Sequence, residues 1–231
     1  MFPIRDSISS RHFPIMNWTI ILLNAAVFIF QIRLPENQLV SFYYHFGLVP
    51  ARFTQPGWAS EAGLQTNNYL PFLTNIFLHG GWFHILSNMW VLFIFGDNVE
   101  GRMGPLRYLA FYLLCGLGAS VTHFFLFNHS QIPVMGASGA IAGVMAAYMF
   151  LFPFSRITFL FPLFFIPLFF TLHAFYFVAI WFLLQLVSGV IDLAGNGHST
   201  GIAFWAHIGG FAVGTILFRF FLSRKKRRVP A

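Results

Sequence analysis

The sequence alternates long apolar blocks with shorter polar connections. Six blocks are long enough, or nearly so, to cross a bilayer, and they cover approximately residues 16–32, 78–96, 105–127, 134–153, 172–192 and 201–221. A helix needs about 20 mainly apolar residues to span the hydrocarbon core. The pattern therefore predicts an all-α, polytopic membrane protein with a bundle of six transmembrane helices.

Two segments do not fit this pattern. The connection from about residue 34 to 70 contains RLPENQ and FTQPGWASEAG, which is too mixed to span and too long for a turn. It is predicted to be a functional external loop or one partly embedded at the interface. The segment ITFLFPLFFIPLFF, residues 157–170, carries Pro162 and Pro167, which interrupt a helix. An interfacial or extended piece before the fifth span is expected there, and a seventh helix is the alternative.

Composition identifies lipid as the solvent. Hydrophobic residues make up 58% of the 231 and charged residues only 8%, whereas a soluble domain is usually about 25% charged. The single Cys115 excludes an internal disulfide framework. The basic run SRKKRR at residues 223–228 follows a span directly, which is typical of a cytoplasmic anchor or of contact with membrane lipids. A nucleic-acid partner is not expected.

Positive charges predict the orientation. If both termini are cytoplasmic, only Arg33 and Arg52 lie outside, and eleven of the 13 lysines and arginines lie inside. This topology divides the chain into a cytoplasmic segment 1–15, a membrane domain 16–221 and a basic cytoplasmic tail 222–231. The second, fourth and sixth spans then descend from the outer face.

Polar side chains inside spans are costly and suggest function. His84 and Asn88 are four residues apart, on one face of the second span, while Ser138 lies near the start of the fourth and His207 in the sixth. At about 1.5 Å per residue, Ser138 and His207 lie roughly 5–12 Å below the outer interface, and the other two lie at a similar depth. A common level on three helices predicts one shared, water-accessible site.

The chemistry of these residues suggests acyl transfer. A serine hydroxyl becomes a good nucleophile when a base takes its proton, and neutral histidine is the usual base near pH 7. His207 is therefore the predicted base for Ser138, with oxyanion donors from His84, Asn88 and the Ser138 N–H. No carboxylate is expected at this level, because the acidic residues of the second span belong to its cytoplasmic end. The arrangement is predicted to be a dyad rather than a triad.

Glycines beside these residues predict close helix packing. Gly136 and Gly139 remove bulk next to the serine, and Gly210 and Gly214 form a GxxxG pattern in the sixth span. Such patterns allow helix backbones to approach closely in membranes. Packing of the fourth span against the sixth would bring the serine to the histidine.

The sequence resembles the rhomboid family of intramembrane serine proteases over about residues 70–217. Its matching motifs are HxxxN (His84, Asn88), GxSG (Gly136, Ser138, Gly139), AHxxGxxxG (Ala206 to Gly214) and an E-x-R turn (Glu100, Arg102). The resemblance implies a six-helix rhomboid-like bundle with Ser138 as nucleophile, His207 as general base and oxyanion contacts from His84 and Asn88. It also implies that transmembrane protein substrates are cut near the outer face, without metal or cofactor. The compact core indicates a bacterial inner (plasma) membrane, and the substrate and the oligomeric state stay open.

Two departures from the family pattern raise structural questions. The first external loop reads NNYLPFLTN where many members carry a Trp-Arg pair, so a different anchor is expected. Position 142 is alanine, whereas many members place there an aromatic ring that packs on the histidine. Another residue must orient His207. His79 is expected near the site entrance in a supporting role, and His123 and His173 are expected at the interface.

Two other functions compete with proteolysis. An inactive rhomboid-like protein would bind membrane clients without cutting them, but that class typically lacks the serine or the histidine. A transporter or channel lined by the same polar residues would carry polar groups through to the inner leaflet, and few are expected below Asn88.

Overall fold

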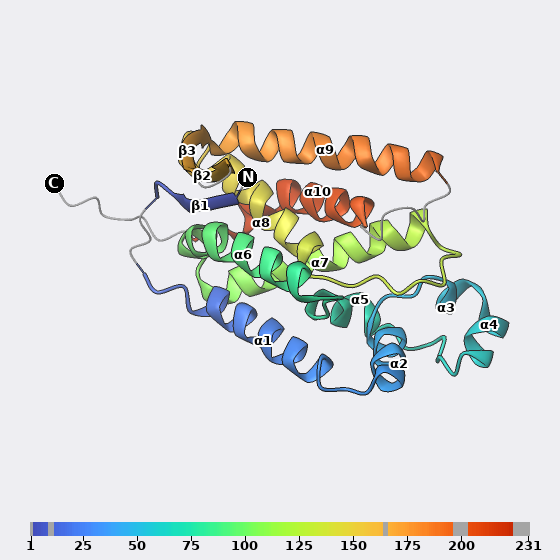
Figure 1. The fold of residues 1–231 in the computed structure, drawn as a ribbon. Coiled ribbons are helices and arrows are strands. Elements are labelled where there is room, and N and C mark those ends of the chain that lie inside the picture. Colours follow the sequence, from blue (N-terminus) through green and yellow to red (C-terminus); the bar gives the residue numbers. More distant parts are fainter. Residues whose placement is uncertain (1, 9–11, 164–165, 196–202, 224–231) are drawn as a thin grey trace.

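The computed structural model describes residues 2–8, 12–163, 166–195 and 203–223, so the basic run at 224–228 lies outside the described residues. Six helices of 14 to 22 residues occupy the six predicted blocks, and their axes run roughly along the length of the bundle (Figure 1). They are α1 (Ile15–Gln31), α6 (Trp82–Met103), α7 (Pro105–Leu126), α8 (Ser138–Leu151), α9 (Ala174–Ala194) and α10 (Phe204–Phe221).

Several of these helices are suited to a bilayer. Three of them, α7, α9 and α10, are long and apolar enough to cross one, and α6 makes a fourth when it is joined to the short helices that precede it. Helices α1 and α8 are apolar but shorter. The chain is mostly helical, and these apolar helices are those of an integral membrane protein.

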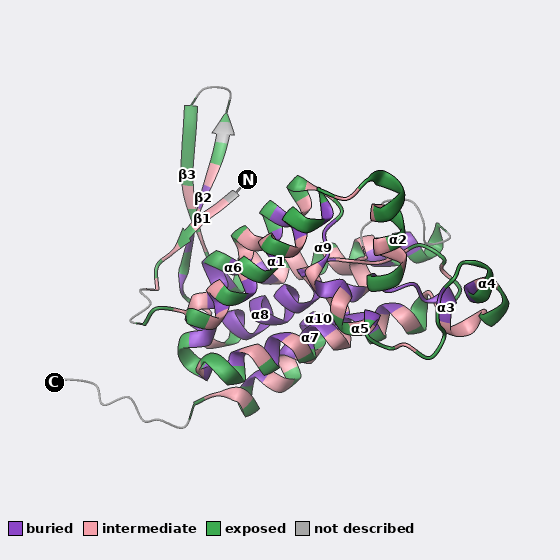
Figure 2. Ribbon diagram, turned by 90° about the horizontal axis from the view of Figure 1, so that it is seen from below, coloured by how far each residue is buried: buried purple, intermediate pink, exposed green. Residues whose placement is uncertain are grey.

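Helix α8 forms the core of the bundle. All residues from Gly139 to Met149 are buried, and α6, α7, α9 and α10 pack around them (Figure 2). With 14 residues, α8 is about 21 Å long, whereas the 22 residues of α7 extend about 33 Å. A helix this short cannot extend the full length of the bundle, so the loop that precedes Ser138 can enter the protein interior.

The chain bends sharply before α6. The short helices α5 (Pro71–Thr74) and η1 (Asn75–Phe77) meet α6 at 90°. Gly80 and Gly81, which disfavour a continuous helix, occupy the break. The second long helix therefore begins at Trp82 rather than at the predicted residue 78.

A buried arginine anchors the long connection between α1 and α5. This connection contains α2 (Glu36–Phe46), α3 (Ala51–Thr54) and α4 (Pro56–Glu61). Arg52 is 1% exposed; its Nε donates to the Gln65 carbonyl (2.6 Å) and its Nη1 to the His45 carbonyl (3.3 Å). Burial lowers the pKa of the Arg52 guanidinium. This side chain ties α3 to segments on both sides of it in a loop that lacks a Trp-Arg pair.

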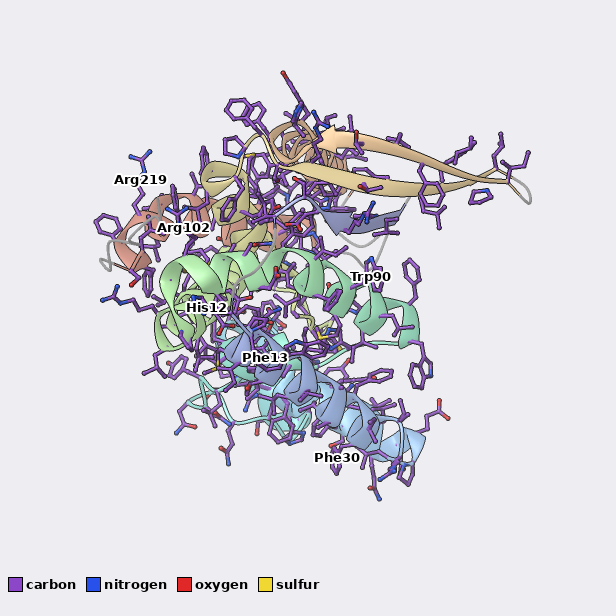
Figure 3. All side chains as sticks on the ribbon, turned by 90° about the vertical axis from the view of Figure 1, so that its left-hand side faces the viewer. His12, Phe13, Phe30, Trp90, Arg102 and Arg219 are labelled. Atoms are coloured by element: carbon purple, nitrogen blue, oxygen red, sulfur yellow. The ribbon has the colours of Figure 1, made fainter. Side chains whose placement is uncertain are left out.

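The all-α prediction is wrong before α9. Strands β2 (Arg156–Leu163) and β3 (Ile166–His173) form an antiparallel hairpin, and β1 (Phe2–Asp6) pairs with the other edge of β2. Pro162 is in register with Pro167; prolines disfavour a helix, and the aromatic and β-branched residues around them favour strands. The expected extended piece is a hairpin that projects from the bundle (Figures 2 and 3). The alternative of a seventh helix is wrong.

Candidate active site

Ser138 is the first residue of α8, and a glycine determines how the chain reaches it. Gly136 has a φ of 135°, in a region that favours glycine. A Cβ at Gly136 would lie 2.6 Å from Nε2 of His84. The Gly136 N–H donates to the Asn75 carbonyl (2.9 Å), which fixes the loop that precedes the serine.

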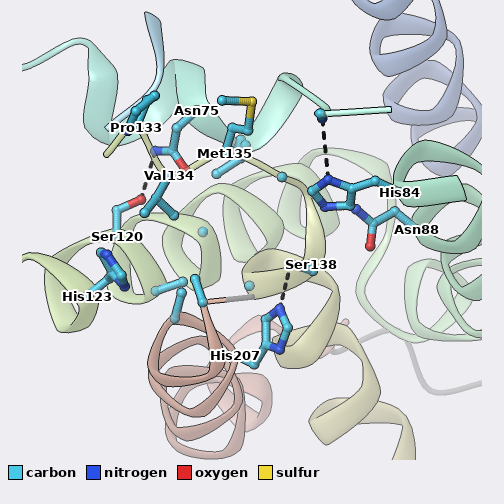
Figure 4. A pocket seen from close by; sticks show the side chains of 18 of the residues that line it. Asn75, His84, Asn88, Ser120, His123, Pro133, Val134, Met135, Ser138 and His207 are labelled. Atoms are coloured by element: carbon cyan, nitrogen blue, oxygen red, sulfur yellow. Dashed lines mark hydrogen bonds between the residues drawn. The ribbon is translucent and has the colours of Figure 1, made fainter. Parts of the chain in front are cut away.

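His207, in the first turn of α10, faces the serine. Its Nε2 lies 2.7 Å from Oγ of Ser138 (Figure 4). Its Nδ1 lies 2.7 Å from Oε1 of Gln185, and the indole of Trp181 is tilted by 32° to the imidazole at a centroid distance of 6.0 Å. Both partners belong to α9. Helix α9 therefore supplies the contacts that orient the histidine in a chain with Ala142 at the aromatic position.

Glycines bring α8 and α10 into backbone contact. A Cβ on Gly210 would overlap the carbonyl oxygen of Gly139, and a Cβ on Gly214 would lie 2.5 Å from Cα of Gly143. The Gly139–Gly210 contact is adjacent to the serine on one helix and three residues after the histidine on the other. It holds the two side chains at the same level.

His84 and Asn88 approach the serine from the first turns of α6. The Gly80 N–H points at Nδ1 of His84 (3.4 Å), and Nε2 of His84 faces the loop at residue 136. The Asn88 amide donates to Nε2 of His79 (3.0 Å). Gln31 of α1 forms two hydrogen bonds with the His79 backbone, of 3.0 and 3.2 Å. His79 is thus fully buried, and its hydrogen bond fixes the position of the Asn88 amide.

Backbone donors lie beside the serine hydroxyl. The first backbone hydrogen bond at the start of α8 runs from the Ile141 N–H to the Ala137 carbonyl (3.0 Å). The N–H groups of Ser138 and Gly139 therefore remain free of acceptors among the described residues. Unpaired N–H groups at a helix N-terminus favour negative charge.

These groups line one cavity of about 520 Å³. Helices α6, α7, α8 and α10, the end of α9 and the loop 130–136 form its walls, and Ser138, His207, His84 and Asn88 all face it (Figure 4). The structure thus brings the four sequence-predicted residues to a single site.

The same cavity contains polar residues that the sequence analysis did not assign to it. Nδ2 of Asn75 donates to Oγ of Ser120 (2.9 Å), and His123, 7% exposed, lines the cavity rather than an interface. Asp192 lines it as well. The expectation of no carboxylate at this level is therefore wrong, because α9 ends at the level at which α10 begins. The position of Asp192 at the end of the fifth span was the available signal.

Comparison with known proteins identifies the family. The family model for the rhomboid domain matches residues 66–224. RHOMBOID-like protein 1 of Arabidopsis thaliana is 34% identical over 151 residues, which are 65% of this chain and 34% of that protein. The candidate rhomboid protease YdcA of Bacillus subtilis (strain 168) is 28% identical over 145 residues, 61% of this chain and 64% of that protein. Since the family model matches well over half of the chain, this protein belongs to the rhomboid family.

The relatives are mostly longer than the matched region. The alignments cover 26%, 27%, 34% and 31% of four Arabidopsis rhomboid-like proteins. The chain therefore aligns with about a quarter to a third of the length of these relatives.

Proposed function

We propose that this protein is a serine endopeptidase that hydrolyses transmembrane protein substrates within the membrane. The observation that carries the proposal is the 2.7 Å contact between Ser138 Oγ and His207 Nε2 on the wall of a cavity. The family assignment and the name of the Bacillus relative support it.

The dyad can perform both halves of the reaction. Nε2 of His207 takes the hydroxyl proton while Ser138 Oγ forms a bond to the scissile carbonyl carbon, and the π electrons of the carbonyl move to its oxygen. When the tetrahedral intermediate collapses, the C–N bond breaks and His207 donates its proton to the leaving amine. Water, deprotonated by His207, then attacks the carbonyl carbon of the acyl-enzyme. The bond between this carbon and Ser138 Oγ breaks, the new carboxyl product leaves, and His207 returns the proton to Oγ.

Donors on two helices can stabilise the oxyanion. The Ser138 N–H belongs to the free N-terminus of α8, and Asn88 keeps a second amide hydrogen besides the one directed at His79. The Gly80 N–H directed at Nδ1 of His84 leaves Nε2 as the protonated nitrogen of a neutral imidazole. Donors that are already in place where charge develops stabilise the transition state without reorganisation.

The charge distribution supports a specific membrane placement. Arg102 of α6 and Arg219 of α10 lie in the last turns of their helices. His207, which contacts Ser138, lies at the opposite end of α10, in its first turn. We place the end with the two arginines, the termini and the hairpin on the cytoplasmic side of a bacterial inner membrane, with six helices crossing. The site then opens toward the outer half of the bilayer. A substrate helix must unwind there, because an intact helix hides its carbonyls.

The test is proteolysis of a model single-span substrate by the purified protein in liposomes. The wild type is expected to cut near the outer end of the substrate helix, and Ser138→Ala and His207→Ala are expected to leave it intact. A serine-directed fluorophosphonate should label the wild type and not Ser138→Ala. Cleavage by either variant at the wild-type rate would overturn the mechanism.

The cavities argue against a transport path. A second cavity of about 240 Å³ lies at the opposite end, where Asp6, Asn17 and Asp97 contribute to its lining. It shares no lining residue with the cavity at Ser138. An inactive client-binding protein would not need the short Ser138–His207 contact.

A further inference from the structure

We propose that Gln185 of α9 is the positioning residue of this site and that it holds His207 in the tautomer that can accept the serine proton. The proposal rests on the proposed function, since it assigns a role within the same dyad. Its basis is the 2.7 Å separation of Gln185 Oε1 from Nδ1 of His207, the nitrogen that does not face Ser138.

The two hydrogen bonds of His207 define its proton state. An amide oxygen only accepts hydrogen bonds, so a neutral imidazole beside it carries its hydrogen on Nδ1. Nε2 then presents a lone pair to the hydroxyl of Ser138, 2.7 Å away. In the other tautomer, Nε2 would donate to the hydroxyl and could not take its proton. The bond made by one ring nitrogen thus determines what the other can do.

The position of α9 makes this contact specific. Trp181, Gln185 and Gly189 are spaced by four residues and share one face of α9. This face is turned toward α10: the indole of Trp181 lies near His207, and the indole Nε1–H of Trp205 donates to the Gly189 carbonyl (2.9 Å). Gln185 is one of the few polar residues of α9, and its contact with His207 satisfies its amide oxygen there.

An amide has a different effect from the carboxylate of a triad. It fixes the ring without adding a buried negative charge, and it stabilises the imidazolium less strongly than a charged acceptor would. Loss of Gln185 should therefore cost about tenfold in rate, the order of one neutral hydrogen bond.

The experiment compares three variants by fluorophosphonate labelling of Ser138 across pH and by kcat and KM for a transmembrane substrate. Gln185→Leu removes the acceptor and should lower the labelling rate and kcat about tenfold at unchanged KM. Gln185→Glu keeps an acceptor at the same reach, so its maximal labelling rate should stay near that of the wild type. Because a carboxylate stabilises the imidazolium, the acid limb of its profile of rate against pH should move to higher pH. Leu184→Ala, on the exposed side of α9, is the matched control and should leave both rates unchanged.

Labelling separates this proposal from the proposed proteolysis, because it needs no transmembrane substrate. A wild type that labels at Ser138 but cuts no substrate would contradict the protease function while the Gln185 variants still test the dyad. Labelling of Gln185→Leu within twofold of the wild type at every pH would overturn the role of Gln185. Nitrogen-15 NMR of the wild type gives an answer even if that variant does not fold: a neutral His207 protonated at Nε2 would overturn the proposal, and protonation at Nδ1 supports it.

Discussion

Helix α6 carries buried polar side chains at both ends, and the two sets have different surroundings. At the end that begins the helix, Asn88 is 7% exposed and lines the cavity beside Ser138. At the other end, Asn98 and Glu100 are 5% and 4% exposed, which is practically the same burial. Neither of these two lines the cavity at Ser138.

The polar groups at the far end are paired with protein atoms. Both carboxylate oxygens of Glu100 accept N–H groups at the start of α1, from Met16 (3.1 Å) and Asn17 (2.7 Å). The Asn17 amide in turn donates to the Leu92 carbonyl (3.1 Å) and accepts the Tyr108 hydroxyl (2.8 Å). These contacts cap the start of α1 and join it to α6 and α7.

The comparison shows that depth and burial alone do not identify a catalytic residue in a membrane protein. Polar residues within spans suggest function by default. At one end of α6, however, they face the cavity at Ser138, whereas at the other end Glu100 binds backbone N–H groups of α1 and Asn98 binds the Asp6 carboxylate. The distinguishing property is whether a polar atom stays available to a substrate. Substitutions at the two ends should therefore affect different quantities.

The largest contrast is expected between Ser138→Ala and Glu100→Ala. Removal of the nucleophile should reduce cleavage about 10⁴-fold or more with no loss of stability. Removal of Glu100 leaves two N–H groups at the start of α1 without their acceptors and should cost about 2–4 kcal/mol of stability. The kcat of the folded fraction should stay within about threefold of the wild type, because none of the proposed catalytic groups moves. Cleavage and thermal unfolding in the same detergent measure both.

Glu100→Gln is the control for this pair. Its amide oxygen can still accept one of the two N–H groups, so its stability should lie between those of the wild type and Glu100→Ala. If Glu100→Ala lost activity at unchanged stability, the division between the two ends of α6 would be wrong.

Two asparagines of the same helix provide the next contrast. Asn88→Ala removes a proposed oxyanion donor and should lower kcat about 10²–10³-fold with little change in KM. Asn98→Ala removes a hydrogen bond to Asp6 (2.8 Å) and should cost about 1 kcal/mol of stability without affecting kcat. A change in KM alone for Asn88→Ala would assign that residue to substrate binding instead.

Much of the helical framework could be predicted because each long helix follows an apolar block, and the order of motifs identified the family. The common level of Ser138 and His207 followed from counting residues along descending helices. Gln185 could not be assigned from the pattern, because α9 is apolar on most of its surface and its rotation about its axis is set by packing. The same rotation directs Asp192 into the cavity.

The sheet was missed for a different reason. Strand β1 pairs with β2 across more than 150 residues of sequence, and nothing local in the polar N-terminal segment indicates a partner so far away. The prolines in the apolar segment disfavoured a helix, but they could not indicate the pairing. Long-range pairing of this kind depends on tertiary structure rather than on local preference.

Arg52 tests whether proximity to the site is sufficient for a catalytic role. It is buried in the long connection between α1 and α5, but it does not line the cavity at Ser138. Arg52→Leu leaves the carbonyls of His45 and Gln65 without their donor and should cost about 1–3 kcal/mol of stability, with kcat changed by no more than about threefold. Arg52→Lys should recover part of the stability. A hundredfold loss of kcat at full stability would contradict this structural role.

The smallest effect is expected at Asp6, which joins β1 to the end of the bundle opposite the site. Burial raises the pKa of Asp6 above its ordinary value of 3.8, although hydrogen bonds from Tyr148 and Asn98 lower it. Between 3.8 and the raised value, the folded protein binds more protons than the unfolded chain, so the free energy of unfolding falls as pH rises through this window. The contribution of Asp6 to the free energy of unfolding is complete below pH 3.8 and is lost as the pH rises above the pKa that Asp6 has in the folded protein.

Asp6→Asn removes this titration and serves as the reference. The Tm of the wild type, relative to that of Asp6→Asn, should decline as pH rises from below 3.8 to neutrality, and kcat should be the same for both proteins. Tyr148→Phe removes a hydrogen bond that lowers the pKa of Asp6, so the decline in the Tm of this variant should extend to higher pH than in the wild type. A wild-type Tm that rose relative to Asp6→Asn over this range would mean that the hydrogen bonds outweigh burial at this carboxylate, which would make the end of the bundle opposite the site more polar than its packing implies.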